Sequence, residues 1–118
     1  MEKHVLVVDD HPGIRLLLEE ILKLEGYRVT IASTGKETLN ILESTPVHLL
    51  IIDQHLPDMK GTQVVESLVN QMHEISVILI SGLTTNLHGF KEQHTTVKAV
   101  IEKPFQIDVL LNVIKESL

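Results

Sequence analysis

The sequence has no cysteine and no tryptophan, and its 118 residues include only one tyrosine and two phenylalanines. Without cysteine the protein has neither disulfide bridges nor thiolate metal ligands, which agrees with a reducing cytoplasm. The shortage of aromatic rings removes the platforms on which nucleic-acid bases stack, and a net charge of −6 repels phosphate backbones. We therefore expect a cytoplasmic protein that does not bind nucleic acid directly.

Long apolar runs are also missing. No segment approaches the roughly 20 residues that a membrane span needs, and the first ten residues lack the features of a signal peptide. We expect no membrane association. A hydrophobic fraction of 43% can bury one core without disulfides or metal staples. This predicts a single domain over residues 1–118, and we expect it to be monomeric. Because the sequence ends at Leu118, we expect no DNA-binding output domain.

Short runs rich in β-branched residues and leucine alternate with longer stretches of helical spacing. The five expected strands are residues 4–9, 28–32, 47–53, 75–81 and 97–101. Several of these runs are apolar at nearly every position, which is typical of parallel strands buried on both faces. The alternation predicts an α/β fold with a doubly wound, five-stranded parallel sheet, (βα)5, in the flavodoxin-like order 2-1-3-4-5.

The first expected helix begins at Pro12, a favoured first-turn residue, and ends before Gly26, which suits a left-handed position. Steps of about 100° per residue predict one buried stripe on this helix: Ile14, Leu17, Leu18, Ile21, Leu22 and Leu24. Leu16 falls on the opposite side. Residues 83–98 form the least regular stretch, because Gly89 interrupts it and its apolar positions are few.

Polar side chains are expected where strands end, which is the edge at which open parallel sheets bind ligands. They are Asp9, Asp10, Asp53, Ser81 and Lys103. Two carboxylates about 4 Å apart repel by around 4 kcal/mol at an effective dielectric of 20, so cations must compensate. Lys103 is one such cation, and a hard divalent ion, Mg²⁺ or Mn²⁺, held by Asp9 and Asp10 is another.

Asp53 is the expected nucleophile toward a phosphoryl group, and Ser81 and Lys103 are expected to bond the phosphoryl oxygens. Taken singly, each neighbour has an ordinary alternative role: helix capping for Asp9 or Asp10, a strand-end hydroxyl for Ser81, a solvated charge for Lys103. In combination with Asp53 the functional interpretation is favoured.

Four segments of the sequence, VVDD, LLIIDQHLPDMKG, ILISG and IEKPF, resemble the receiver domains of two-component response regulators in order and in spacing. The resemblance implies that Asp53 accepts a phosphoryl group from a histidine kinase or a histidine-containing phosphotransferase. It implies that Asp10, Asp53 and the backbone carbonyl of His55 hold the metal, with Asp9 acting through water. It also implies a cis peptide between Lys103 and Pro104, and no enzymatic activity beyond self-phosphorylation and slow dephosphorylation.

Within that family, the segments DDHPGIRLLL, EGY and KPFQID are similar to stand-alone receivers of sporulation phosphorelays. Those receivers use the first helix and adjacent loops to dock their partners. The resemblance implies the following contact residues: His11, Pro12, Gly13, Ile14, Leu17, Pro104 and Phe105.

Other features depart from the family or leave alternatives open. Val100 stands where many receivers have an aromatic switch residue, so order and disorder of residues 83–96 is the alternative signal. A pseudo-receiver that only binds proteins is the second candidate function. A haloacid-dehalogenase-like phosphatase needs a second acid where His55 stands, and a flavin binder needs a phosphate loop where DDHPG stands.

The seven histidines show no i, i+4 spacing of the kind that binds zinc. His11 and His55 lie beside the acidic residues in the sequence and could tune water access or docking. A solvated loop histidine is the commoner role for each.

Overall fold

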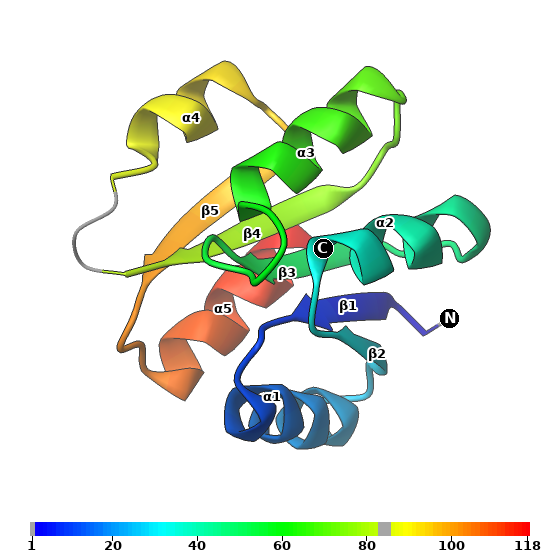
Figure 1. Ribbon diagram of the computed structural model, residues 1–118. Helices are drawn as coiled ribbons and strands as arrows, with labels where there is room; N and C mark the ends of the chain where they lie inside the picture. The colour runs from blue at the N-terminus through cyan, green and yellow to red at the C-terminus, as the bar shows by residue number, and fades with distance from the viewer. Residues whose placement is uncertain (1, 83–85) are drawn as a thin grey trace.

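A single five-stranded parallel sheet with helices on both faces makes up the computed structural model, which describes residues 2–82 and 86–118 (Figure 1). The strands are β1 (His4–Val8), β2 (Arg28–Ala32), β3 (Leu49–Asp53), β4 (Ser76–Ser81) and β5 (Val97–Glu102). The helices are α1 (Pro12–Leu24), α2 (Gly35–Ser44), α3 (Gly61–Asn70), α4 (His88–Gln93) and α5 (Ile107–Ser117). In this part of the chain no helix is long and apolar enough to cross a membrane.

The strand order is β2-β1-β3-β4-β5, which confirms the predicted fold class and order. Several predicted strand bounds are wrong by one or two residues. β1 ends at Val8, before Asp9, and β3 and β4 begin at Leu49 and Ser76. β5 extends to Glu102, because this residue pairs with Ser81 on β4. Strand ends depend on pairing with a neighbour, which an apolar run does not reveal.

The two faces of the sheet carry separate cores, because successive side chains of a strand point to opposite faces. One face bears Leu6, Val8, Leu50 and Ile52 and packs against α2 and α3 with the residue before α4. The other bears Val5, Val7, Leu49 and Ile51 and packs against α1 and α5. Figure 1 shows this division, with α1 and α5 together on one side. Both faces of the central strands are buried, as their apolar runs predict.

The predicted stripe of α1 is only partly correct. Leu18 and Leu22 are buried, and Ile14 lies partly buried against the same core. Leu17 and Leu24 were expected on the stripe, but they are 48% and 85% exposed. The buried face is centred between Leu18 and Leu22, so it is narrower and rotated relative to a stripe centred on Ile14.

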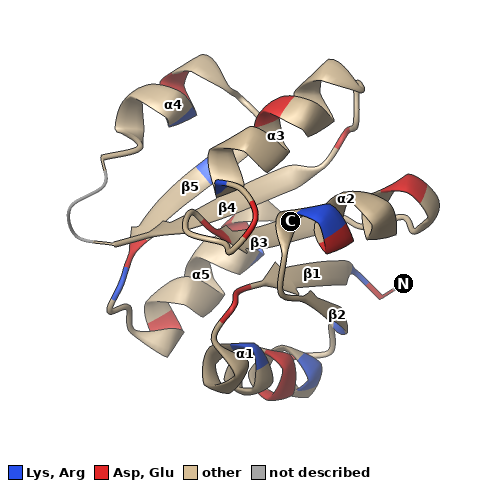
Figure 2. Ribbon diagram, viewed as in Figure 1, with Lys and Arg blue, Asp and Glu red and all other residues tan. Residues whose placement is uncertain are grey.

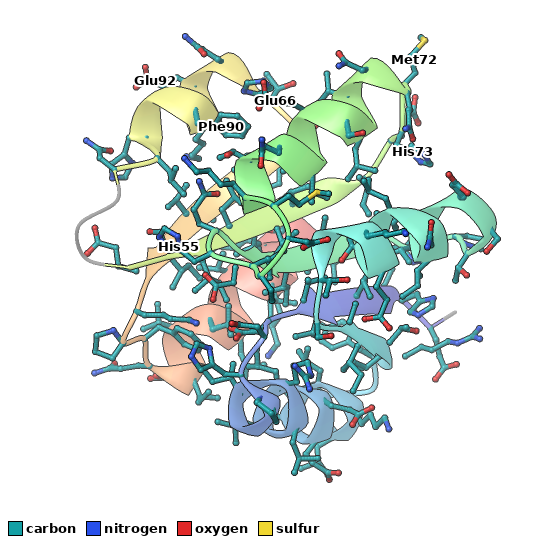
Figure 3. The ribbon with its side chains drawn as sticks, in the orientation of Figure 1. His55, Glu66, Met72, His73, Phe90 and Glu92 are labelled. Carbon is teal, nitrogen blue, oxygen red and sulfur yellow. The ribbon has the colours of Figure 1, made fainter. Side chains whose placement is uncertain are left out.

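Two helices end in the same hydrogen-bonded motif. After α1, Gly26 has a φ of 92°, and the N–H groups of Gly26 and Tyr27 donate to Lys23 and Leu22. This confirms the predicted left-handed glycine. After α3, the N–H groups of Met72 and His73 donate in the same pattern, but Met72 takes the left-handed position with a φ of 59°. Its side chain projects from the end of the helix (Figure 3).

Within its described residues, 86–98, the irregular stretch forms a short helix, α4, and the first two residues of β5. α4 has six residues and no buried residue of its own. Leu87, just before it, is buried, and Phe90 lies partly buried against the same core (Figure 3). Residues 83–85, which belong to the proposed ordering segment, lie outside the described residues.

Replacing Met72 by glycine is expected to stabilise the protein by about 0.5–1 kcal/mol. A non-glycine residue in the left-handed region costs roughly 1–2 kcal/mol, part of which is offset by the greater freedom of glycine in the unfolded chain. Met72 is 87% exposed, so little packing is lost. Urea unfolding of wild type and Met72→Gly measures the difference.

Gln71→Gly is the control, because Gln71 precedes Met72 with an ordinary φ of −87°. Here glycine should not stabilise. A Met72→Gly protein less stable than wild type would contradict the expected strain at Met72.

Candidate functional site

The carboxyl ends of β1, β3, β4 and β5 meet at one edge of the sheet. Asp9 and Asp10 directly follow β1, Asp53 is the last residue of β3, and Ser81 is the last residue of β4. Lys103 follows β5. In Figure 2 an acidic segment in red follows β1, and a basic segment in blue follows β5. The parallel arrangement therefore brings side chains from four separate segments to the same edge.

Lys103 links two buried carboxylates. Its Nζ donates to Asp53 Oδ2 at 2.8 Å and to Asp9 Oδ2 at 3.0 Å. Asp9 and Asp53 are 1% and 3% exposed, whereas the Lys103 side chain is 22% exposed. These three predicted residues, distant in sequence, thus form one hydrogen-bonded group. The predicted cis peptide between Lys103 and Pro104 is present beside it.

The ionisation of this group follows from its contacts. Burial raises the pKa of Asp9, but hydrogen bonds from the His11 backbone and from Lys103 outweigh it and leave that pKa below the ordinary value. Burial lowers the pKa of Lys103, but the bonds to Asp53 and Asp9 outweigh it and leave that pKa raised. Lys103 is therefore charged at neutral pH and stabilises the ionised form of Asp9.

Donor atoms for a metal converge beside this group. One ligand atom from each of Asp9, Asp10, His11 and Asp53 lies within 4.8 Å of the others. His11 Nδ1 is 2.9 Å from Asp9 Oδ1 and 3.2 Å from Asp10 Oδ1. Three carboxylates match the oxygen preference of a hard divalent ion, so the donor set fits the predicted metal. From the sequence, His11 was expected to lie beside the acidic residues and to contribute to docking or water access; its direct contact with the two carboxylates was not predicted.

Ser81 is buried and incompletely bonded. Its side-chain oxygen has no hydrogen-bond partner within residues 2–82 and 86–118. It lies one residue beyond Ile80, the β4 residue that pairs with Asp53. A buried hydroxyl without a partner costs about 1–3 kcal/mol. The Ser81 hydroxyl therefore has capacity to bond a group at this edge, beside Asp53.

The loop after Asp53 is held from two sides. The His55 backbone N–H donates to Asp53 Oδ1 at 3.2 Å, which orients the carboxylate. Gly61 brings the start of α3 so close that a Cβ there would lie 2.7 Å from the Asp53 carbonyl oxygen. Asp58 accepts hydrogen bonds from the N–H groups of Gly35 and Lys36 at the start of α2. These contacts fix the loop that follows Asp53.

Two residues that hold the site in place, Asp58 and Arg15, were not predicted from the sequence. Asp58 accepts its bonds from α2, and Arg15 donates from Nη1 to the Asp9 carbonyl oxygen at 2.8 Å. Both contacts join residues of different elements. For Arg15, a helix start at Pro12 places it on the first turn after the carboxylates, which was a usable signal.

The predicted docking residues lie around this edge with different exposures. His11, Pro12, Gly13, Leu17 and Pro104 are exposed. Ile14 and Phe105 are partly buried and pack against the core shared by α1 and α5. Docking by these residues stays a prediction, which their positions on α1 and beside Lys103 allow.

Comparison with known proteins relates the whole chain to one family. Residues 5–115 match the family model of the response regulator receiver domain. Response regulator RR06 of Streptococcus pneumoniae is 35% identical over 95% of this chain, but the chain spans only 51% of that protein. Sporulation initiation phosphotransferase F of Bacillus subtilis is 30% identical, and the match covers 100% of this chain and 95% of the relative.

Solved structures agree with this relationship. The receiver domain protein (CheY-like) from Methanospirillum hungatei has a TM-score of 0.89 at 33% identity, covering 98% of this chain and 93% of that one. Response regulator TrrA from Thermotoga maritima, solved in complex with Mg²⁺-BeF, has a TM-score of 0.81 at 29% identity, covering 98% and 99%.

Replacing Lys103 by methionine is expected to destabilise the protein by about 2–4 kcal/mol near neutral pH, because two buried carboxylates lose their cation. The penalty should shrink in acid. Asp9, whose pKa is lowered, contributes stability above its ordinary pKa of about 3.9, and that stability is lost as pH falls through the lower folded-state pKa. Urea unfolding at several pH values measures both effects.

Lys115→Met is the matched control. Lys115 Nζ lies 3.7 Å from Glu25 Oε1, and its side chain is 60% exposed, so its loss should change stability by less than about 1 kcal/mol. Equal penalties for the two lysine variants would show that the Lys103 contacts contribute no special stability.

Proposed function

Because this chain belongs to the response regulator receiver domain family, we propose that Asp53 is the residue on which it accepts a phosphoryl group. One arrangement carries the proposal: a buried carboxylate at the end of β3 is bonded to the partly buried ammonium of Lys103, and a hydroxyl without a partner in the described residues lies at the end of the next strand. That set supplies a nucleophile and two donors for the oxygens of the group it receives.

Transfer needs one Asp53 oxygen to attack phosphorus. As the O–P bond forms, the P–N bond of a partner's phosphohistidine breaks, and its electron pair stays on the imidazole nitrogen as a lone pair. Asp53 Oδ2 accepts from Lys103 and Oδ1 from the His55 N–H, but each carboxylate oxygen keeps a further lone pair. After transfer, Lys103 and Ser81 donate to phosphoryl oxygens. The Ser81 hydroxyl thereby gains an acceptor, which it does not have within residues 2–82 and 86–118.

The metal site is formed by the same acidic residues. We assign Asp10, Asp53 and the His55 carbonyl as direct ligands of Mg²⁺ or Mn²⁺, with Asp9 acting through water. The converging carboxylates support this assignment, as does the similarity to TrrA, solved with Mg²⁺-BeF. A bound divalent ion supplies positive charge against the phosphoryl oxygens. Asp9 and His55 then orient the site through their contacts with Lys103 and Asp53.

The partner is proposed to be a histidine kinase or a histidine-containing phosphotransferase. The surface for it comprises His11, Pro12, Gly13, Ile14, Leu17, Pro104 and Phe105. Exposed Leu17 beside the acidic edge supports a docking role, since leucine at such a position buries apolar area only when a partner covers it. Similarity to sporulation initiation phosphotransferase F supports a phosphorelay, with a sporulation pathway as the specific case.

The protein is proposed to work as a cytoplasmic single-domain switch, with chemistry limited to gaining and slowly losing its own phosphoryl group. Phosphorylation adds about −1.5 to −2 charge at Asp53 and shifts a conformational equilibrium. Val100 is partly buried against the α2 and α3 core and provides no rotating aromatic ring. The signal is therefore proposed to pass through ordering of the segment around α4, whose helix is short.

Incubation with Mg²⁺ and acetyl phosphate, followed by intact-mass measurement, tests the acceptor. Wild type should gain one phosphoryl group, and Asp53→Asn should gain none, because the amide is a far weaker nucleophile. Asp108→Asn is the control, since Asp108 is an exposed carboxylate on α5 that takes no part in the site. It should be phosphorylated like wild type.

A wild-type protein that never gains the mass would support the pseudo-receiver instead. Phosphorylation that persists in Asp53→Asn would move the acceptor to another residue. A second readout is amide exchange over residues 86–96, which should change on phosphorylation; identical exchange would exclude the α4 segment as the route of the signal.

A further inference from the structure

His11 makes side-chain contacts that are not needed to begin α1. It is the N-cap of α1, with φ −87° and ψ 112°, yet its side chain makes no capping hydrogen bond to the helix. Its backbone N–H instead donates to Asp9 Oδ1 at 2.9 Å. That bond turns the residue toward the carboxylates, and the ring follows: Nδ1 lies beside oxygens of Asp9 and Asp10.

The separations suit ligands of one ion. Adjacent ligands of an octahedral ion with bonds of about 2.1 Å lie about 3.0 Å apart. His11 Nδ1 lies 3.2 Å from Oδ1 of Asp10, which is a proposed direct ligand. It also lies 2.9 Å from Oδ1 of Asp9, which is proposed to act through water. The widest pair in the group of four is no more than 4.8 Å apart, against about 4.2 Å for opposite ligands. The His11 side chain is 63% exposed, so packing does not prevent its ring from turning toward an ion.

Lys103 does not compete for the same atoms. It bonds Oδ2 of Asp9 and Oδ2 of Asp53, whereas His11 lies at Oδ1 of Asp9. The buried Ser81 hydroxyl, unpartnered within the described chain, independently indicates that this edge receives a ligand. A cation at the His11 side can therefore coexist with the ammonium of Lys103.

We propose that His11 Nδ1 is a direct metal ligand, which shifts the selectivity of this site from Mg²⁺ toward nitrogen-binding transition ions such as Co²⁺, Ni²⁺ or Zn²⁺. The inference rests on the proposed metal-dependent receiver function and adds a ligand to it. Mg²⁺ favours oxygen donors and keeps its waters, while imidazole suits the later first-row ions. A site in which an imidazole joins the oxygen ligands of Asp10, Asp53 and the His55 carbonyl thus discriminates differently from one of oxygen ligands alone.

Titration of the full chain with Co²⁺ and with Mg²⁺, by calorimetry and by visible absorption of the cobalt complex, tests this in wild type and His11→Gln. Loss of outer-shell partners alone weakens metal binding about 10–100-fold, so loss of a direct ligand should weaken Co²⁺ binding at least tenfold. Mg²⁺ affinity should change much less, and the cobalt spectrum should shift. His88→Gln, an exposed histidine on α4, controls for adventitious surface binding and should leave both affinities unchanged.

Two outcomes would overturn the inference. If the imidazole is only a hydrogen-bond donor to the carboxylates, His11→Gln will bind Co²⁺ as tightly as wild type, with the same spectrum. If His88→Gln loses as much Co²⁺ affinity as His11→Gln, the binding lies on the surface. In either case, if the protein still binds Mg²⁺ and is still phosphorylated, the proposed function stands. If wild type binds neither Mg²⁺ nor Co²⁺, both the His11 inference and the proposed metal-dependent function are wrong.

Discussion

Lys103 holds Asp9 and Asp53 together at an edge where parallel strands leave two buried carboxylates side by side. Each carboxylate is almost fully removed from water, so their repulsion is only weakly screened. The Lys103 ammonium bonds both at 2.8–3.0 Å and offsets that repulsion. Asp10, His11 and the loop after β3 lie beside this contact, because each adjoins Asp9 or Asp53 in the sequence, and His11 and His55 bond those two carboxylates directly.

The site remains electrostatically incomplete even with Lys103 in place. Asp9, Asp10 and Asp53 carry three negative charges against one ammonium, and the Ser81 hydroxyl, within the described residues, has no acceptor. The proposed divalent ion offsets the first deficit, and the proposed phosphoryl group supplies an oxygen that meets the second. Burying like charges and an unbonded hydroxyl costs folding free energy. Such unfavourable groups tend to occur at functional sites, as they do here at the edge proposed to bind a metal ion and a phosphoryl group.

Strand-end reasoning predicted Asp9, Asp53 and Lys103 because parallel topology alone brings such ends together. It did not predict Arg15 and Asp58, because their contacts depend on how α1 and α2 pack beside the loops. Helical periodicity placed Leu17 and Leu24 in the core, but both are exposed. Periodicity predicts only that the helix has an apolar side; the width and centre of its buried face depend on how the helix packs against the sheet.

The alternation of apolar runs and helical stretches by itself determined the doubly wound sheet, its two buried faces and, to within one or two residues, the ends of its strands. Burial periodicity and parallel connection are properties of the chain. The tertiary structure alone decided which atoms meet: Lys103 with Oδ2 of both carboxylates, His11 Nδ1 with Oδ1 of Asp9, and Met72 in a left-handed position. Those contacts are set by packing between segments far apart in sequence, and their energies depend on distances of a few tenths of an ångström that no spacing encodes.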